Sequence, residues 1–425
     1  MSTLATSVRA NELAAIVGDK HIVEATSALA PFAIDGIAPT VAVSPGSADE
    51  VAAVLRYAYE RDLVVVPSGG FVHQEIGKTP WAIDVLLRMD RLSNVEHYDP
   101  GDLTIGVGAG FALSDLQSMV RDQRQVFPVD IANADRATIG GTMAVGAHGP
   151  HKHFFGGIRE FCIGVRFVTA DGKLGKGGGR VVKNVAGFDF MKLMIGSFGT
   201  LGVITSASFK LFPQPVATRT FVSEFPSVKE AIDYRDRVIN SPLSPICLEM
   251  LSPRATGKDC WSIAVRAGGS DRVLARYNSE LQTTVTHGIE GPEEQKFWAD
   301  VENLGSEAPL RLSASLPPSM GGEFLYYASR IADENNLHFT GWGRIGIGSL
   351  LVAVENGMAE SYVAFVQALR KKLPPDGSCV LTRCPVSLKP DINVWGSTPT
   401  NVEAMRMARN ALSPKDNLNR GRFLL

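Results

Sequence analysis

The sequence is poor in the features that mark several classes of protein. Its five cysteines form no C-x-x-C pair, so structural zinc and iron–sulfur sites are not expected; they are Cys162, Cys247, Cys260, Cys379 and Cys384. An odd cysteine count without a secretion signal predicts reduced thiols and a cytoplasmic location. No stretch approaches the roughly 18 consecutive apolar residues of a membrane helix, so membrane association is expected at most peripherally, through partners. A formal net charge of -2 gives no attraction to nucleic acid.

Common nucleotide-binding and hydrolase motifs are also missing. A Walker A loop requires Gly-x-x-x-x-Gly-Lys-Ser/Thr, which the sequence does not contain. The nearest approach to the dinucleotide motif G-x-G-x-x-G begins at Gly106 and has Phe111 in place of the last glycine. Neither G-x-S-x-G nor H-E-x-x-H occurs. Kinases, nicotinamide dehydrogenases, serine hydrolases and zinc proteases are therefore not supported.

Glycine is unevenly distributed. Of the 42 glycines, 23 lie between Gly69 and Gly202, where they interrupt well-patterned strands and helices. A glycine has no Cβ, so a concentration of glycines outside a flexible linker indicates backbone that closely approaches a ligand.

Hydrophobic periodicity and turn residues predict two domains, 35–214 and 215–425, separated at Pro213-Gln214-Pro215. In the first we expect helices at 47–61 and 113–123 and strands at 41–43, 63–67, 82–87, 103–107, 163–170 and 203–212. In the second we expect helices at 228–239, 271–282 and 361–373, with strands near 246–251, 261–266, 311–316, 350–354 and 379–381. Both domains are therefore predicted to mix helices and strands.

Three glycine-containing loops are candidates for ligand binding. They are Pro67-Ser68-Gly69-Gly70, Thr138-Ile139-Gly140-Gly141, and Lys183-Asn184-Val185-Ala186-Gly187-Phe188-Asp189 with Gly199-Thr200-Leu201-Gly202-Val203-Ile204 behind it. Each alone could be an ordinary turn, although successive backbone N–H groups in such a loop suit a pyrophosphate.

In this order the loops resemble those of the vanillyl-alcohol oxidase/PCMH-type flavoproteins, and the third is most similar to the glycolate oxidase and D-lactate dehydrogenase branch. Further strings, Arg383-Cys384-Pro385, Val394-Trp395-Gly396 and Asn417-Leu418-Asn419-Arg420-Gly421-Arg422-Phe423, extend the likeness toward the glycolate oxidase FAD-binding subunit. The resemblance implies an α+β fold, with a two-subdomain FAD-binding domain followed by a smaller α+β substrate or cap domain.

The resemblance also implies FAD as cofactor. The residues expected to bind it are Ser68, Gly69, Gly70, Phe71, Val72, His73, Gln74, Thr138, Ile139, Gly140, Gly141, Thr142, Gly146, Asn184, Gly187, Asp189, Gly199, Gly202, Val203 and Ile204. Two departures stand out: Phe71 occupies a place usually held by a small residue, and His73 stands two positions beyond the histidine that bonds FAD covalently in some relatives. Covalent attachment is therefore the lesser expectation.

His148, His151 and His153 form an H-x-x-H-x-H group that could be a metal site, a proton acceptor beside the flavin, or a set of polar loop residues. No carboxylate or cysteine stands at a confirming position, so no metal is expected. The H-x-G-D-G-N-x-H signature of D-lactate and D-2-hydroxyglutarate dehydrogenases is also absent; the nearest string is Glu334-Asn335-Asn336-Leu337-His338-Phe339.

Oxidation of a 2-hydroxy acid requires a cation for the carboxylate and a base for the hydroxyl proton. Candidate cations are Arg311, Arg344 and Arg383, of which we favour Arg344 and Arg383, with His148 as the candidate base. The leading hypothesis is the FAD-binding subunit of a glycolate oxidase-type complex that oxidises glycolate or D-lactate, with a sister FAD subunit and an iron–sulfur subunit as partners. The alternatives are a self-sufficient FAD dehydrogenase or oxidase of another alcohol, and a non-catalytic FAD-carrying subunit.

Overall fold

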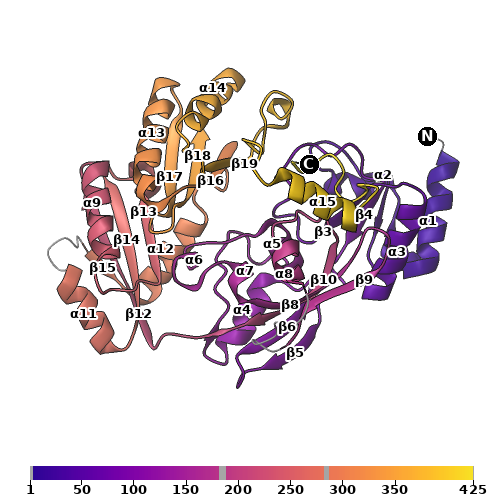
Figure 1. Cartoon of the computed structure of the whole chain (residues 1–425), viewed down its shortest axis with the longest axis horizontal. Helices are drawn as coiled ribbons and strands as arrows, with labels where there is room; N and C mark the ends of the chain where they lie inside the picture. Colours follow the sequence, from indigo (N-terminus) through magenta and orange to yellow (C-terminus); the bar gives the residue numbers. More distant parts are fainter. Residues whose placement is uncertain (1–2, 181–187, 282–286, 425) are drawn as a thin grey trace.

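The computed structural model describes residues 3–180, 188–281 and 287–424. Two domains lie side by side, with the first domain in purple and the second in pink and orange (Figure 1). The first contains a sheet of four strands, a sheet of five strands and a two-stranded sheet, and the second contains one sheet of eight strands. No helix in the described ranges is long and apolar enough to cross a membrane.

The first sheet has the order β1 (Ile22–Val23), β2 (Val41–Val43), β4 (Val85–Arg88) and β3 (Val65–Ser68). Strands β2, β4 and β3 run parallel, and helix α3 (Ala48–Glu60) makes the crossover after β2. The Ser47 side chain accepts a hydrogen bond from the Glu50 N–H at 3.1 Å, which is the predicted cap of this helix. Because β3 ends at Ser68, the first glycine loop emerges from the carboxyl edge of the sheet, where ligands bind in parallel sheets.

The second sheet is antiparallel, with the order β5 (Val95–Asp99), β6 (Thr104–Gly108), β10 (Val203–Lys210), β8 (Cys162–Val168) and β9 (Leu174–Gly178). The turn at Asp171 and Gly172 joins β8 to β9 as the hairpin that these residues predict. Helices α4 (Leu113–Arg121) and α5 (Ile139–Val145) accompany this sheet, and α5 carries the second glycine loop.

The second domain is built on one antiparallel sheet. Its order is β15 (His287–Ile289), β12 (Ala217–Phe225), β14 (Trp261–Gly269), β13 (Cys247–Leu251), β17 (His338–Arg344), β18 (Ser349–Glu355), β16 (Leu310–Ser315) and β19 (Ser378–Arg383). This is the largest sheet in the described residues.

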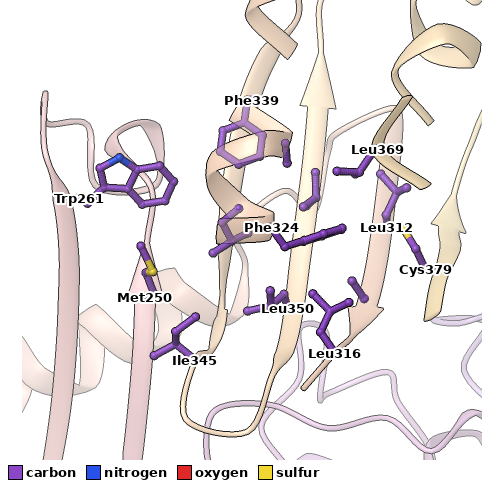
Figure 2. Packing of buried hydrophobic residues seen from close by; sticks show 14 of the residues in the cluster. Met250, Trp261, Leu312, Leu316, Phe324, Phe339, Ile345, Leu350, Leu369 and Cys379 are labelled. Carbon is purple, nitrogen blue, oxygen red and sulfur yellow. The ribbon is translucent and has the colours of Figure 1, made fainter. Parts of the chain in front are cut away.

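Helices cover one face of this sheet: α9 (Val228–Ile239), α11 (Asp271–Leu281), α13 (Gly321–Glu334) and α14 (Ala359–Arg370). Figure 2 shows the apolar core on this side, where Phe324 lies among Leu312, Leu316 and Leu350. A second cluster on the opposite face includes Trp298 of α12 (Gly291–Glu302). The rest of that face turns toward the first domain.

The first domain extends beyond its predicted limits of 35 and 214. Helix α1 (Thr3–Val17) packs against α3, and β1 joins the first sheet. At the other end of the chain, α15 (Val402–Leu412) lies over the first domain (Figure 1). Beyond it, Asn417 O accepts from Val65 N at 2.8 Å and Asn419 N donates to Val65 O at 2.9 Å. This pairing joins residues more than 350 positions apart, so no local pattern could have predicted it.

Candidate functional site

Two adjoining cavities contain nearly all of the predicted site residues. The loop cavity lies within the first domain and is lined by the 67–74 loop, the start of α5 and the 199–204 segment. The sheet cavity, of about 340 Å³, lies between these loops and the open face of the eight-stranded sheet. The two share the following wall residues: Val72, His73, Ile76, Val145, Phe198 and Trp395.

The 69–74 segment offers a row of free backbone donors to the loop cavity. Among the described residues, none of its six backbone N–H groups has a protein acceptor. Ser68 Oγ and His73 Nε2 are likewise buried without a hydrogen-bond partner. Buried polar groups in native proteins are almost always satisfied, so such a row indicates a polar ligand. These donors fit the pyrophosphate of FAD.

The paired glycines at the start of this loop let it pack against the second loop. A Cβ on Gly70 would lie 1.6 Å from the Arg136 carbonyl oxygen, and one on Gly69 would lie 2.0 Å from Thr138 Oγ1. In contrast, the nearest atom to a Cβ on Gly141 is Thr138 Oγ1 at 3.2 Å. The tightest steric requirement is therefore at 69–70, where one loop meets the other.

The structure shows how Phe71 fits at a position where relatives usually have a small residue. Its φ is +62°, the left-handed region that a small residue or glycine adopts more readily. Its ring packs against Phe32, with centroids 5.6 Å apart. The loop thus keeps a conformation usual for glycine while the side chain packs on the first sheet.

Apart from Asp189, the predicted cofactor residues fall into four groups. Those on the wall of the loop cavity are Ser68, Gly69, Gly70, Phe71, Val72, His73, Gln74, Thr138, Gly140, Gly141, Gly199, Gly202, Val203 and Ile204. Gly146 lines the sheet cavity instead, while the Ile139 and Thr142 side chains are buried behind the wall. Asn184 and Gly187 lie outside the described residues.

Asp189 is placed differently from the prediction. It is exposed at the start of α8 (Phe190–Met194), where its carboxylate accepts from Lys192 N and pairs with Lys192 Nζ at 2.8 Å. It lines neither cavity. Asp is a common helix N-cap, and this local role accounts for its position.

The C-terminal segment supplies three wall residues that were not predicted: Trp395, Asn419 and Arg422. Arg422 donates to Gln74 Oε1 and Gln74 O, both at 2.6 Å, and thereby holds the first glycine loop. Burial lowers the pKa of Arg422 to about 10. The similarity of the 417–423 string to the flavoprotein subunit was the available signal, but it gave no role to these side chains.

The sheet cavity is formed by alternation along the strands. Glu249, Arg344, Arg311 and Thr382 lie on one face because their neighbours Leu248, Leu312 and Leu381 are packed in the core on the other. Strands β13, β17, β16 and β19 carry these four residues, which are distant in sequence. Of these four residues, only Arg344 was one of the cations favoured from the sequence.

Arg344 is fully buried and already has an internal partner. Its Nε lies 4.0 Å from Glu249 Oε1 and donates to Ser349 O at 3.2 Å. Burial raises the pKa of Glu249 to about 8 despite the nearby guanidinium, and its two oxygens have no hydrogen-bond partner.

Arg383 and Arg311 differ in whether a carboxylate pairs with them. Arg383 Nε contacts Glu75 Oε2 at 2.5 Å, and its Nη1 donates to the Ser306 carbonyl. Arg311 donates only to Thr382 Oγ1, at 3.3 Å, and no carboxylate within the described residues lies at salt-bridge distance from it. Burial, and then Arg383, lower the pKa of Arg311. The charge of Glu75 acts in the opposite direction. Among the described residues that line this cavity, Arg311 is therefore the arginine without a carboxylate at salt-bridge distance.

The three clustered histidines have separate surroundings. His148 lines the sheet cavity; burial, Arg344 and Lys152 hold its pKa well below the usual range, and its Nδ1 has no partner. His151 pairs with Asp130, whereas His153 packs against Gly346. No group of three metal-ligating residues occurs in the described parts of the chain.

His73, with its pKa lowered to about 4 by burial and Arg311, is a second neutral imidazole beside the loop cavity.

Comparison with known sequences agrees with this geometry. Residues 39–177 match the FAD binding domain family. The chain is 25% identical to a D-lactate dehydrogenase of Archaeoglobus fulgidus, over 90% of this chain and 91% of that protein. It is 35% identical to a D-2-hydroxyglutarate dehydrogenase of Xanthomonas citri and 37% identical to the Escherichia coli glycolate oxidase subunit GlcE. These two matches cover 44% and 32% of this chain, and only 40% and 39% of the respective relatives.

Solved structures show the same fold over the whole chain. Substrate-bound p-cresol methylhydroxylase superposes with a TM-score of 0.75 at 14% identity, covering 99% of this chain and 97% of the other. An alkyldihydroxyacetonephosphate synthase gives a TM-score of 0.70 at 16% identity, covering 100% and 86%. The chain therefore has the p-cresol methylhydroxylase fold and is an FAD-binding oxidoreductase, in which residues 39–177 match the FAD binding domain family.

Proposed function

We propose that the protein oxidises a small 2-hydroxy acid to the 2-oxo acid in the sheet cavity, with FAD held in the loop cavity. The observation that carries this proposal is Arg311, a largely buried guanidinium without a carboxylate partner, in the cavity that shares His73 with the cofactor loop. A buried cation is stabilised by an anion, and a substrate carboxylate supplies one. The names of the relatives, which include lactate, 2-hydroxyglutarate and glycolate, support the same substrate class.

The residues around Arg311 suit the reaction. Bound FAD would accept the hydride from the substrate carbon. The hydroxyl proton needs an acceptor that is unprotonated before the reaction, and both His148 and His73 have lowered pKa values and a buried ring nitrogen without a partner. We favour His148 as the acceptor because it lines the sheet cavity alone, whereas His73 also lines the loop cavity.

The cation assignment is thereby revised from the sequence prediction. Arg344 has Glu249, and Arg383 has Glu75 and the Ser306 carbonyl, so both are already engaged. We therefore propose Arg311 as the group that binds the carboxylate. Arg383 would support it by lying beside it, since the two guanidinium groups repel each other and the pair favours an anion between them.

Electrons must then leave the flavin. The five cysteines are unpaired in the structure, and four of them are buried. The likeness to glycolate oxidase subunits supports a multi-subunit complex, in which we propose a sister FAD subunit and an iron–sulfur subunit as partners. We further propose a cytoplasmic location, which the unpaired thiols support. The likeness to the archaeal D-lactate dehydrogenase over 91% of its length favours the second candidate, a self-sufficient dehydrogenase.

Substitution of Arg311 tests the proposal. For Arg311→Met we expect a loss in kcat/KM for the hydroxy acid of roughly 10- to 100-fold, because a charged hydrogen bond contributes about 1.5–3 kcal/mol. FAD binding should be unchanged. The free energy of unfolding without substrate should not fall, because the variant removes a buried charge that has no internal ion partner.

Arg254→Met is the matched control. Arg254 is an exposed cap-domain arginine that pairs with Glu355 at 3.1 Å and lines neither cavity. Its replacement should leave kcat/KM unchanged. If Arg311→Met oxidises the hydroxy acid as well as the parent protein, or if it loses stability, the proposed role of Arg311 is wrong.

A further inference from the structure

We propose that Glu302, Asp130 and His151 form a path that carries the proton released by substrate oxidation out of the sheet cavity. The path would end in a third cavity, the interdomain cavity, which has a volume of about 860 Å³ and lies between the two domains. This inference rests on the proposed function, because it concerns the proton that such an oxidation releases.

The oxidation sets a requirement for such a path. The substrate C–H bond breaks and its electron pair leaves with the hydrogen as hydride for the flavin, while the O–H bond breaks and its hydrogen leaves as a proton. The C–O single bond becomes a carbonyl. One proton therefore remains on the protein for each substrate molecule, and an imidazole that accepts it must release it before the next turnover.

Two carboxyl groups stand in the wall between the cavities. Glu302 and Asp130 line both the sheet cavity and the interdomain cavity. Glu302 is the last residue of α12 in the cap, whereas Asp130 lies in the first domain after strand β7 (Gln125–Val126). The two residues come from different domains and line the same two cavities, and the charge of Asp130 acts on Glu302.

His151 extends the proposed path from Asp130 into the interdomain cavity. Its backbone N–H donates to Asp130 Oδ2 at 2.8 Å, and its Nδ1 directly contacts Asp130 Oδ1. The other ring nitrogen, Nε2, lies 3.5 Å from Arg266 Nη1. His151 lines the interdomain cavity and not the sheet cavity. An imidazole can accept a proton at one nitrogen and release one from the other, which is what a path out of the site requires.

The surroundings give the two carboxyl groups different proton affinities. Burial, and then the charge of Asp130, raise the pKa of Glu302, so that Glu302 can hold a proton near neutral pH. Burial alone would raise the pKa of Asp130, but His151 holds it below its usual range. The charged and titratable groups that act on the path or on its immediate neighbours are Arg266, Glu249, Arg344, Cys247 and Glu294.

The test compares flavin reduction with proton release in the FAD-loaded protein. D-Lactate or glycolate is mixed with it anaerobically in weak buffer containing a pH indicator, and the flavin absorbance and indicator are followed together. In the parent protein the proton should appear with the loss of flavin absorbance. In Glu302→Gln, which keeps the size of the side chain, proton release should lag by at least about 10-fold. Release that keeps pace in this variant would overturn the proposal.

Two further variants separate a path from a structural effect. Glu290→Gln removes a carboxylate that lines only the interdomain cavity and pairs with Arg219 at 2.8 Å, so proton release should be unchanged. His151→Asn retains a donor for Asp130 but cannot relay a proton, so release should again lag. If Glu290→Gln slows release as much as Glu302→Gln does, the effect is general to the cleft and the specific path is wrong.

A measurement without substrate tests Glu302 independently of turnover. Infrared difference spectroscopy during a pH titration should show a protonated carboxyl band near neutral pH that is missing from Glu302→Gln. Absence of that band in the parent protein would overturn the role of Glu302. If no 2-hydroxy acid reduces the parent flavin, it is the proposed function that fails; if the flavin is reduced normally and release is unaffected in Glu302→Gln, only the path fails.

Discussion

The two cavities are built by opposite means. The loop cavity is made from backbone: six successive N–H groups, paired glycines and the start of one short helix, most of them within 67–74 and 138–145. The sheet cavity is made from long side chains on four strands, of which Glu249 and Arg383 are 134 positions apart. The first recognises a group that many proteins bind in the same way, whereas the second can change its ligand by changing a few side chains.

The treatment of charge differs in the same way. Among the described residues, Arg422 has the only charged side chain that lines the loop cavity, and backbone dipoles would bind the anion there. In the sheet cavity, charged side chains pair with one another. Arg344 and Arg383 have carboxylate partners, whereas Arg311 has none at salt-bridge distance among the described residues. An unpartnered cation costs stability, and it is retained where a ligand supplies the missing anion.

The largest expected effect in the loop cavity comes from Gly70→Ala. The added Cβ would meet a backbone oxygen, which cannot move without displacing the second loop. Overpacking of this kind costs roughly 1–3 kcal/mol, so FAD affinity should fall about 10- to 100-fold. Titration of the apoprotein with FAD, followed by flavin fluorescence, measures this loss.

Gly141→Ala is the matched control, because its Cβ would meet only Thr138 Oγ1, at 3.2 Å. The affinity of this variant for FAD should fall by less than that of Gly70→Ala. An equal loss in both variants would mean that the glycines make room for the cofactor and not for the neighbouring loop.

In the sheet cavity, Glu249→Gln should change the pH dependence of stability. The pKa of Glu249 is raised from 4.5 to about 8 in the folded protein, so its contribution is fully present below pH 4.5 and is lost as the pH rises through 8. The free energy of unfolding should therefore decline by up to about 1.4 kcal/mol per pH unit in this window. The variant should lack that decline, as measured by urea unfolding at several pH values. An unchanged slope would show that Glu249 is ionised in the fold.

The smallest effect is expected for Phe71→Gly. Glycine removes the strain of a φ of +62°, about 1–2 kcal/mol, but it also removes the contact with Phe32, worth about 0.5–1.5 kcal/mol. Thermal unfolding should therefore shift by only a few degrees. A large loss of stability would mean that the Phe71 ring, and not the loop conformation, holds the first loop on its sheet.

The contrast between the cavities also explains what the sequence could predict. The 67–74 and 138–141 loops were predicted because their function depends on local backbone and on glycine. Arg311 was one of three candidate arginines, and only the strand pairing of β16 with β18 and β19 shows that it faces the cavity without a carboxylate. Glu249, Asp130 and Glu302 could not be identified, because an acidic residue in a strand, loop or helix end has no local pattern that reveals burial. Asp189 was misplaced because a capping aspartate looks the same in sequence as a ligand-binding one.

The most direct test of this account is the visible absorption spectrum of the purified protein, supplemented with FAD and then mixed anaerobically with glycolate or D-lactate. The account predicts a flavin spectrum that remains with the protein through gel filtration and loses its absorbance when the hydroxy acid is added. A protein that stays colourless after incubation with FAD would contradict the assignment of the loop cavity. A bound flavin that no 2-hydroxy acid reduces, with or without added subunits, would contradict the assignment of the sheet cavity.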